Sequence, residues 1–186
     1  MTKENVAVLK IKEDINKVNY KPAKDYIVTL VPGNYVHTLW KDVVPFLNKA
    51  VERSNGRWSL DALKVACIQQ RQELWVIFKE EDNKIMGVAT TEFVHYPNSK
   101  RLAIQYLGGA DLEDWAWSFL KKAEAWAVDN KCHGIECTAR FGFWKWLGKS
   151  GWDKAYTVFE KRFNNEYRRR RWSTIHTINS NTNKFT

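Results

Sequence analysis

The chain has 186 residues, and its 44 % hydrophobic content with ten Trp is enough apolar material for one sizeable core. Three irregularly spaced cysteines argue against a disulfide framework, and no apolar run approaches the length of a membrane-spanning helix. The formal net charge is +9, and residues 161–186 carry six of those nine charges, so the basic character belongs to a tail.

The first predicted element is a strand, Tyr26–Val31, which a Pro-Gly turn closes. Apolar residues at helical spacing then predict a helix from Val36 to Val51, and Pro45 is expected to kink or restart it. A short helix follows at residues 60–70, with Ser59 as its cap. These elements form the β-α-α beginning of the fold.

Three strands come next, at residues 74–79, 85–94 and 102–106. Polar turns at residues 81–84 and 96–99 separate them, so we expect consecutive antiparallel neighbours.

The second half begins with the clearest helical pattern, from Leu112 to Ala127, which Asp111 is expected to cap. A short strand at 134–138, a short helix at 141–148 and a final strand at Tyr156–Phe163 complete the chain. The predicted order is therefore β-α-α-β-β-β-α-β-α-β.

Five short motifs occur in this order: Gln-Glu-Leu-Trp-Val (72–76), Met-Gly-Val-Ala-Thr-Thr (86–91), Tyr-Leu-Gly-Gly (106–109), Ile-Glu-Cys-Thr-Ala-Arg (135–140) and Gly-Trp (151–152). With them, residues 26–163 resemble the GCN5-related N-acetyltransferase (GNAT) superfamily, and within it the GNAT-like proteins of tailed phages. The resemblance implies an α/β (α+β) domain with a mixed, mostly antiparallel sheet flanked by helices. It leaves a polar N-terminal arm at 1–25 and a basic, polar C-terminal tail at 164–186.

In that superfamily, acetyl-CoA enters between the fourth and fifth strands, and a Gly-rich loop holds its diphosphate at a helix N-terminus. The residues that match this cofactor-binding pattern are Gln105, Gly108, Gly109 and Ala110. An alternative interpretation is a tight glycine turn before a capped helix. Asp111, Glu113 and Asp114 favour this alternative, because their carboxylates repel a diphosphate.

The resemblance also assigns roles in proton transfer. Glu92 and Glu136 are the candidate general bases, although each is also consistent with a solvated strand residue. Leu147 stands where the family often carries a Tyr that acts as the general acid, and Leu cannot donate a proton. Arg140 replaces the family's Asn, and it either binds a pantetheine amide or phosphate or pairs with one of the two glutamates. The histidines lack ligand spacing, so no metal site is predicted.

The aromatic and basic residues suggest contacts with partners. Trp117 lies off the apolar face of its helix and is expected to be exposed. The candidate partner-binding residues are Trp117, Arg168, Arg169, Arg170, Arg171 and Trp172. Exposed Trp beside Arg is typical of protein docking sites, and four consecutive Arg are also compatible with a nucleic-acid backbone.

Two hypotheses for function follow. The first is a structural or virion-associated phage protein that docks on other virion proteins through its terminal arms and has weak or no acetyltransferase activity. The second is an acetyl-CoA-dependent N-acetyltransferase that acts on an amine. The first needs no cofactor and the second needs acetyl-CoA, so whether the chain is an enzyme stays open. The polar start at residues 1–5 indicates no signal peptide, which favours the host cytoplasm or a virion.

Overall fold

The computed structural model describes residues 26–161. Residues 26–152 belong to one compact unit, which contains all of the helices and strands described below. Residues 153–161 belong to a second unit and form neither helix nor strand.

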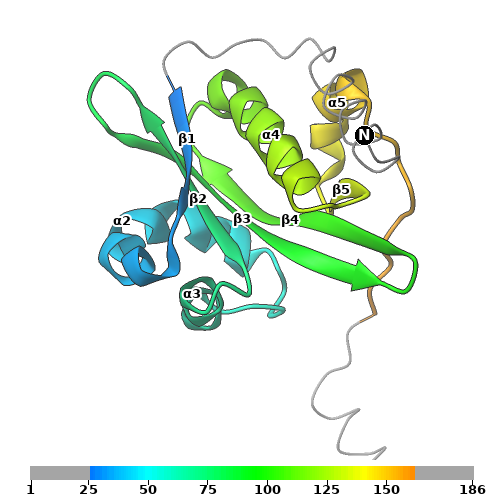
Figure 1. Ribbon diagram of the computed structural model, residues 1–186, viewed down its shortest axis with the longest axis horizontal. Coiled ribbons are helices and arrows are strands. Elements are labelled where there is room, and N and C mark those ends of the chain that lie inside the picture. Colours follow the sequence, from blue (N-terminus) through cyan, green and yellow to red (C-terminus); the bar gives the residue numbers. More distant parts are fainter. Residues whose placement is uncertain (1–25, 162–186) are drawn as a thin grey trace, which may run out of the picture. The chain divides into compact units, whose positions relative to one another are not determined.

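One five-stranded sheet organises the first unit, with its strands side by side in chain order (Figure 1). The strands are β1 (Tyr26–Val31), β2 (Glu73–Lys79), β3 (Ile85–Tyr96), β4 (Ser99–Gly109) and β5 (Gly134–Cys137). β1 to β4 pair antiparallel, whereas β4 and β5 are parallel. The predicted mixed, mostly antiparallel sheet is confirmed.

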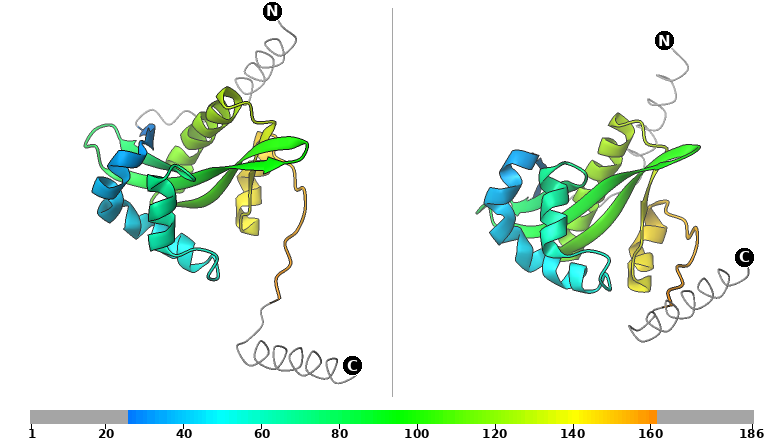
Figure 2. Two further views of the ribbon diagram at one scale, coloured as in Figure 1. Left: turned by 60° about the horizontal axis from the view of Figure 1, so that its bottom comes forward. Right: turned by 90° about the horizontal axis from the view of Figure 1, so that it is seen from below.

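Helices cover both faces of this sheet (Figure 2). The longer helices are α2 (Gly33–Glu52), α3 (Leu60–Ile68) and α4 (Leu112–Asp129). The short helix α5 (Trp144–Leu147) lies between two 3-10 turns, η1 (Phe141–Phe143) and η2 (Gly148–Ser150). α2 and α3 pack on one face and α4 on the other. Within the described residues, no helix is both long and apolar enough to cross a membrane.

Each face of the sheet has its own apolar core, because side chains alternate along every strand. On the α2 and α3 face, Val36, Val43 and Leu47 pack against the strands, together with Leu63. On the α4 face, Trp115 and Phe119 are completely buried. The α4 face also holds an edge-to-face pair of Trp75 and Phe119 rings, with centroids 5.8 Å apart.

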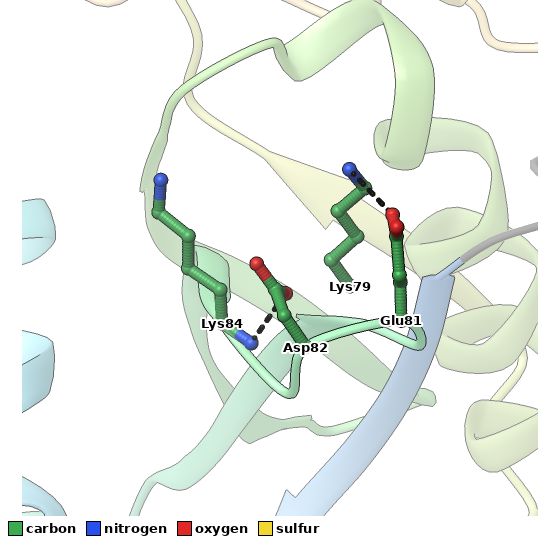
Figure 3. A network of polar contacts seen from close by, with 4 residues as sticks. All are labelled: Lys79, Glu81, Asp82 and Lys84. Atoms are coloured by element: carbon green, nitrogen blue, oxygen red, sulfur yellow. Dashed lines mark hydrogen bonds and ion pairs between the residues drawn. The ribbon is translucent and has the colours of Figure 1, made fainter.

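Local signals account for several element ends. The Ser59 side chain accepts a hydrogen bond of 3.1 Å from the backbone N–H of Ala62, which confirms it as the cap of α3. In the turn between β2 and β3, the Asp82 carboxylate accepts a hydrogen bond of 3.0 Å from the Lys84 N–H (Figure 3). Lys79 and Glu81 form an ion pair of 3.2 Å across the same turn.

Three predicted details need correction. Of the two outcomes expected at Pro45, the restart is excluded, because Pro45 lies inside α2, which continues through it as one helix. Asp111 holds the cap position of α4, but its backbone is left-handed at φ 49° and its side chain makes no capping hydrogen bond. Trp117 is partly buried rather than exposed, and it packs against the core on the α4 face.

The final strand predicted at Tyr156–Phe163 is also wrong in its described part, residues 156–161. Tyr156 is 73 % exposed and Phe159 is 91 % exposed. Apolar alternation favours a strand only when a partner supplies backbone hydrogen bonds, and the described sheet ends at β5. Residues 162–163 lie outside the described part of the chain.

Candidate functional site

β4 and β5 are paired along only part of their length. Their register joins residues 101–104 of β4 to residues 134–137 of β5, where β5 ends. β4 continues to Gly109 beside β3 alone, and the register with β3 shifts at Gln105. Such a bulge bends a strand, and bulges often lie next to functional sites. The end of the β4–β5 pairing is therefore the candidate site of this fold.

Two glutamates stand on the same face at this point. Glu92 of β3 pairs with Ala103 of β4, and Ala103 pairs in turn with Glu136 of β5. Directly paired residues share a face of the sheet, so the two carboxyl groups flank the single methyl group of Ala103. Two strand spacings place the Cα atoms of the glutamates about 10 Å apart. The predicted bases thus lie on neighbouring sides of one small residue.

The face they occupy is the one that α2 and α3 cover. Leu74 belongs to the core on that face and pairs with Thr90, and Glu92 follows two residues later. Each carboxylate is oriented by a neighbour. Glu92 accepts a hydrogen bond of 3.0 Å from the amide nitrogen of Gln72. Glu136 accepts one of 2.8 Å from the hydroxyl of Tyr96.

Around Glu92 lies a set of polar side chains that we call the polar cluster: Gln72, Thr90, Glu92 and Tyr106. Gln72 is 1 % exposed and Thr90 is completely buried. The Oε1 atom of Gln72 and the Oγ1 atom of Thr90 are both buried without a hydrogen-bond partner. Because an unpaired buried polar atom destabilises a fold by about 1–3 kcal/mol, two of them together need an explanation.

Tyr106 completes the polar cluster as the direct partner of Thr90 on β4. Burial raises the pKa of its phenol, and a hydrogen bond with Ser54 acts in the opposite direction. The net effect keeps the hydroxyl protonated at neutral pH, so Tyr106 acts as a hydrogen-bond donor and acceptor rather than as a charge.

Most of the residues predicted to hold a cofactor diphosphate lie in a strand and not in a loop. Gln105, Gly108 and Gly109 belong to β4, and only Ala110 lies beyond it. A Cβ atom on Gly108 would collide with the carbonyl oxygen of Phe46, and one on Gly109 with the ring of Trp115. Both glycines therefore make room for the protein itself. Cofactor binding by this segment stays a prediction.

Arg140 and Leu147 follow β5. The guanidinium of Arg140 lies 5.9 Å from the centre of the Phe143 ring, and it forms no ion pair with Glu92 or Glu136 among the described residues. Leu147 is buried in the core on the α4 face. The Leu147 side chain therefore packs in the interior, and it has no proton to donate to a leaving thiolate.

The cysteines are unsuited to nucleophilic chemistry at neutral pH. Burial raises the pKa of Cys67 to about 12 and that of Cys137 to about 11, and it also raises the pKa of Cys132. The thiolate is the reactive form, so these thiols stay inert. In the part of the chain that the structure describes, no group of three or more His, Cys, Asp or Glu is placed to hold a metal ion.

Of the predicted partner-binding residues, only Trp117 lies within the described range. Arg168, Arg169, Arg170, Arg171 and Trp172 lie outside it, so docking through them stays a prediction.

Sequence reasoning placed both glutamates but missed Gln72, Thr90 and Tyr106. A signal for two of them exists, because Gln72, Thr90 and Glu92 fall on one face when the alternation of β2 and β3 is extended. Tyr106 could not be placed in this way, since the bulge at Gln105 reverses the alternation along β4.

No protein-family model matches the sequence, and no curated protein matches it. Solved structures do match. A GNAT family acetyltransferase from Staphylococcus aureus is 14 % identical, with a TM-score of 0.53, and the match covers 75 % of this chain and 99 % of that one. An aminoglycoside acetyltransferase from an uncultured soil metagenomic sample is 12 % identical, with a TM-score of 0.59 and coverage of 75 % and 99 %.

A third similar structure is AAC(6')-Iy, which was solved in complex with the bisubstrate analogue CoA-S-monomethyl-acetylneamine. It is 12 % identical, with a TM-score of 0.57, and the match covers 75 % of this chain and 98 % of that one. At such identities the likeness shows the fold, which is that of GNAT acetyltransferases. Nothing in these likenesses bears on the tailed-phage resemblance, which stays a prediction.

Proposed function

We propose that this protein transfers an acyl group from a thioester to a primary amine, with Glu92 as the general base. The observation that carries the proposal is the position of Glu92 beside Ala103, one residue before the β4–β5 pairing ends at Ile104, in a fold shared with acetyltransferases. The Glu92 carboxylate takes one proton from the bound ammonium, and the free amine then attacks the thioester carbonyl. The C–S bond breaks, and the leaving thiolate takes the second nitrogen proton, so that an amide and a thiol result.

The polar cluster supplies the chemistry that recognises an amine. A primary ammonium carries three N–H donors. The acceptors of the polar cluster are the Glu92 carboxylate, which is partly exposed, and the buried, unpartnered Oε1 of Gln72 and Oγ1 of Thr90. An ammonium bound there would satisfy both orphaned atoms, and its binding requires the buried side chains of Gln72 and Thr90 to open toward it.

Acetyl-CoA is the donor that the fold implies, and the chain fits only part of it. The stretch of β4 that is not paired with β5, residues 105–109, offers the backbone groups of that edge to an extended thioester arm. The first turn of α4 does not suit the diphosphate, because Asp111, Glu113 and Asp114 place three exposed carboxylates there. The proposal is therefore confined to a thioester donor.

The test is release of free thiol from a simple acetyl thioester in the presence of primary amines, followed with a chromogenic thiol reagent. Thiol release that depends on the amine, with the acetylated amine detected by mass spectrometry, is the expected result. Hydrolysis at the same rate with and without amine would contradict the proposal.

Thr90→Val separates binding from packing. Valine has nearly the same shape and removes the unpartnered hydroxyl, so we expect the free energy of unfolding to rise by about 1 kcal/mol. If the hydroxyl contacts the amine, KM for the amine should rise about tenfold. Urea unfolding and steady-state kinetics measure the two effects. Higher stability with unchanged KM would remove Thr90 from the amine site.

The hypothesis of a structural or virion-associated role depends on the terminal arms. Both arms, residues 1–25 and 162–186, lie outside the described range, so this role, its partners and its location stay predictions. It remains a separate proposal, and the thiol-release assay also bears on it, since efficient turnover would favour the enzyme.

A further inference from the structure

The segment that should bind a diphosphate is already engaged within the protein. The N–H of Ala110 donates a hydrogen bond of 2.9 Å to the carbonyl of Met86. The carbonyl of Ala110 accepts one of 2.6 Å from the indole of Trp115. The N–H of Asp114 donates to the carbonyl of Asp111. A helix N-terminus binds anions through free backbone N–H groups. Near the N-terminus of α4, the N–H groups of Ala110 and Asp114 already donate hydrogen bonds within the protein.

The glycines of the segment leave no cradle for a ligand. The space that a Cβ would fill at Gly108 is occupied by the backbone of Phe46 in α2. At Gly109 it is occupied by the carbonyl of Met86 and the ring of Trp115. In a phosphate-binding loop the missing side chain lets the backbone approach the phosphate, whereas here it lets strand β4 approach its own neighbours.

The local charge has the wrong sign for a diphosphate. No Lys or Arg occurs between Arg101 and Lys121, and the charged residues of that stretch are Asp111, Glu113 and Asp114. All three are exposed at the start of α4. Negative groups are stabilised at a helix N-terminus, so these carboxylates compete directly with any anionic ligand.

From these observations we propose that the donor is an acyl thioester of pantetheine that lacks the nucleotide diphosphate. The inference rests on the proposed acyl transfer and names its donor class. Recognition is confined to the thioester and the amide-rich arm, which are neutral and can pair with the free edge of β4 after Ile104. The arm arrives either as a free small molecule or attached to a carrier protein.

Calorimetric titration of the full chain with pantetheine and with coenzyme A, at 50 and 300 mM salt, tests this inference without requiring turnover. We expect coenzyme A to bind no more tightly than pantetheine. We also expect its affinity to rise at the higher salt, because screening weakens the repulsion by the three carboxylates. The affinity for uncharged pantetheine should stay the same.

A matched variant carries Asp111→Asn, Glu113→Gln and Asp114→Asn. Asn tolerates the left-handed backbone of position 111, so the fold should be kept. We expect this variant to bind coenzyme A about tenfold more tightly and pantetheine unchanged. A carrier protein bearing the pantetheine arm, titrated in parallel, distinguishes the two sources, and tighter binding than free pantetheine assigns the carrier-bound one.

Two results would overturn the inference. The first is wild-type affinity for coenzyme A at least tenfold above that for pantetheine. The second is no measurable binding of pantetheine in any form. A protein that binds pantetheine but acylates no amine would instead contradict the proposed function while supporting the donor selectivity, so the two failures are distinguishable.

Discussion

Trp115→Ala should lower the free energy of unfolding by about 3–5 kcal/mol, which is a large part of the 5–15 kcal/mol typical of a domain. Trp115 is completely buried at the start of α4. Its ring fills the space beside Gly87 and Gly109, and its indole N–H bonds the carbonyl of Ala110. The substitution therefore creates a cavity and leaves an acceptor unpaired. Urea unfolding followed by circular dichroism measures the loss.

Trp117→Ala is the matched control on the same helix. Trp117 is only partly buried against the core on the α4 face, so its removal should have a clearly smaller effect. Equal losses of stability in the two variants would mean that the contacts of Trp115 with the glycines of β3 and β4 contribute no more than the partial burial of Trp117.

Most elements of the sheet unit could be predicted because their signals are local. Tyr26–Val31 matches β1 residue for residue, and Ile85 begins both the predicted and the observed third strand. Turn residues and alternation are contained within a few positions, so tertiary contacts had little to override. The strand predicted at Tyr156–Phe163 had the same local signal, but a strand also needs a partner outside its own sequence.

The glycines show what local reasoning cannot reach. A Gly-Gly pair before a helix is compatible with a ligand loop or with close packing, and the sequence left both interpretations open. The atoms that decide between the two interpretations belong to Phe46 and Trp115. Phe46 is far from Gly108 in sequence, and Trp115 lies on α4, beyond the turn that follows Gly109. Close approach of backbone to backbone leaves no mark except the glycine itself.

The candidate site was predictable in part for a related reason. Glu92 and Glu136 could be placed because each lies on a strand whose existence was clear from the sequence. Their common face depends on the β4–β5 register, which is a tertiary property. Burial of Gln72 and Thr90 could not be predicted either, since Gln and Thr side chains are mostly exposed in folded proteins.

Glu92→Gln should lower kcat/KM for acyl transfer by about 10²–10⁴-fold, the usual contribution of a general base. Glutamine keeps the size of the side chain, and its amide oxygen can still accept the hydrogen bond from Gln72. The fold should therefore be unchanged, and the loss should come from the missing proton acceptor. Steady-state kinetics with a primary amine, together with urea unfolding of the same variant, measure both quantities.

Glu136→Gln is the matched control, because Glu136 stands on the other side of Ala103 and on the same face. Its carboxylate is held by Tyr96 on an exposed part of the β3–β4 hairpin, whereas Glu92 is held by the buried Gln72. A buried partner fixes the base more firmly against the reacting nitrogen, so we expect Glu136→Gln to lower the rate less than tenfold. If Glu136→Gln has the larger effect, the roles are exchanged and the amine lies toward β5. If both variants keep full activity, neither carboxylate is the base, and the orphaned atoms of Gln72 and Thr90 need another explanation.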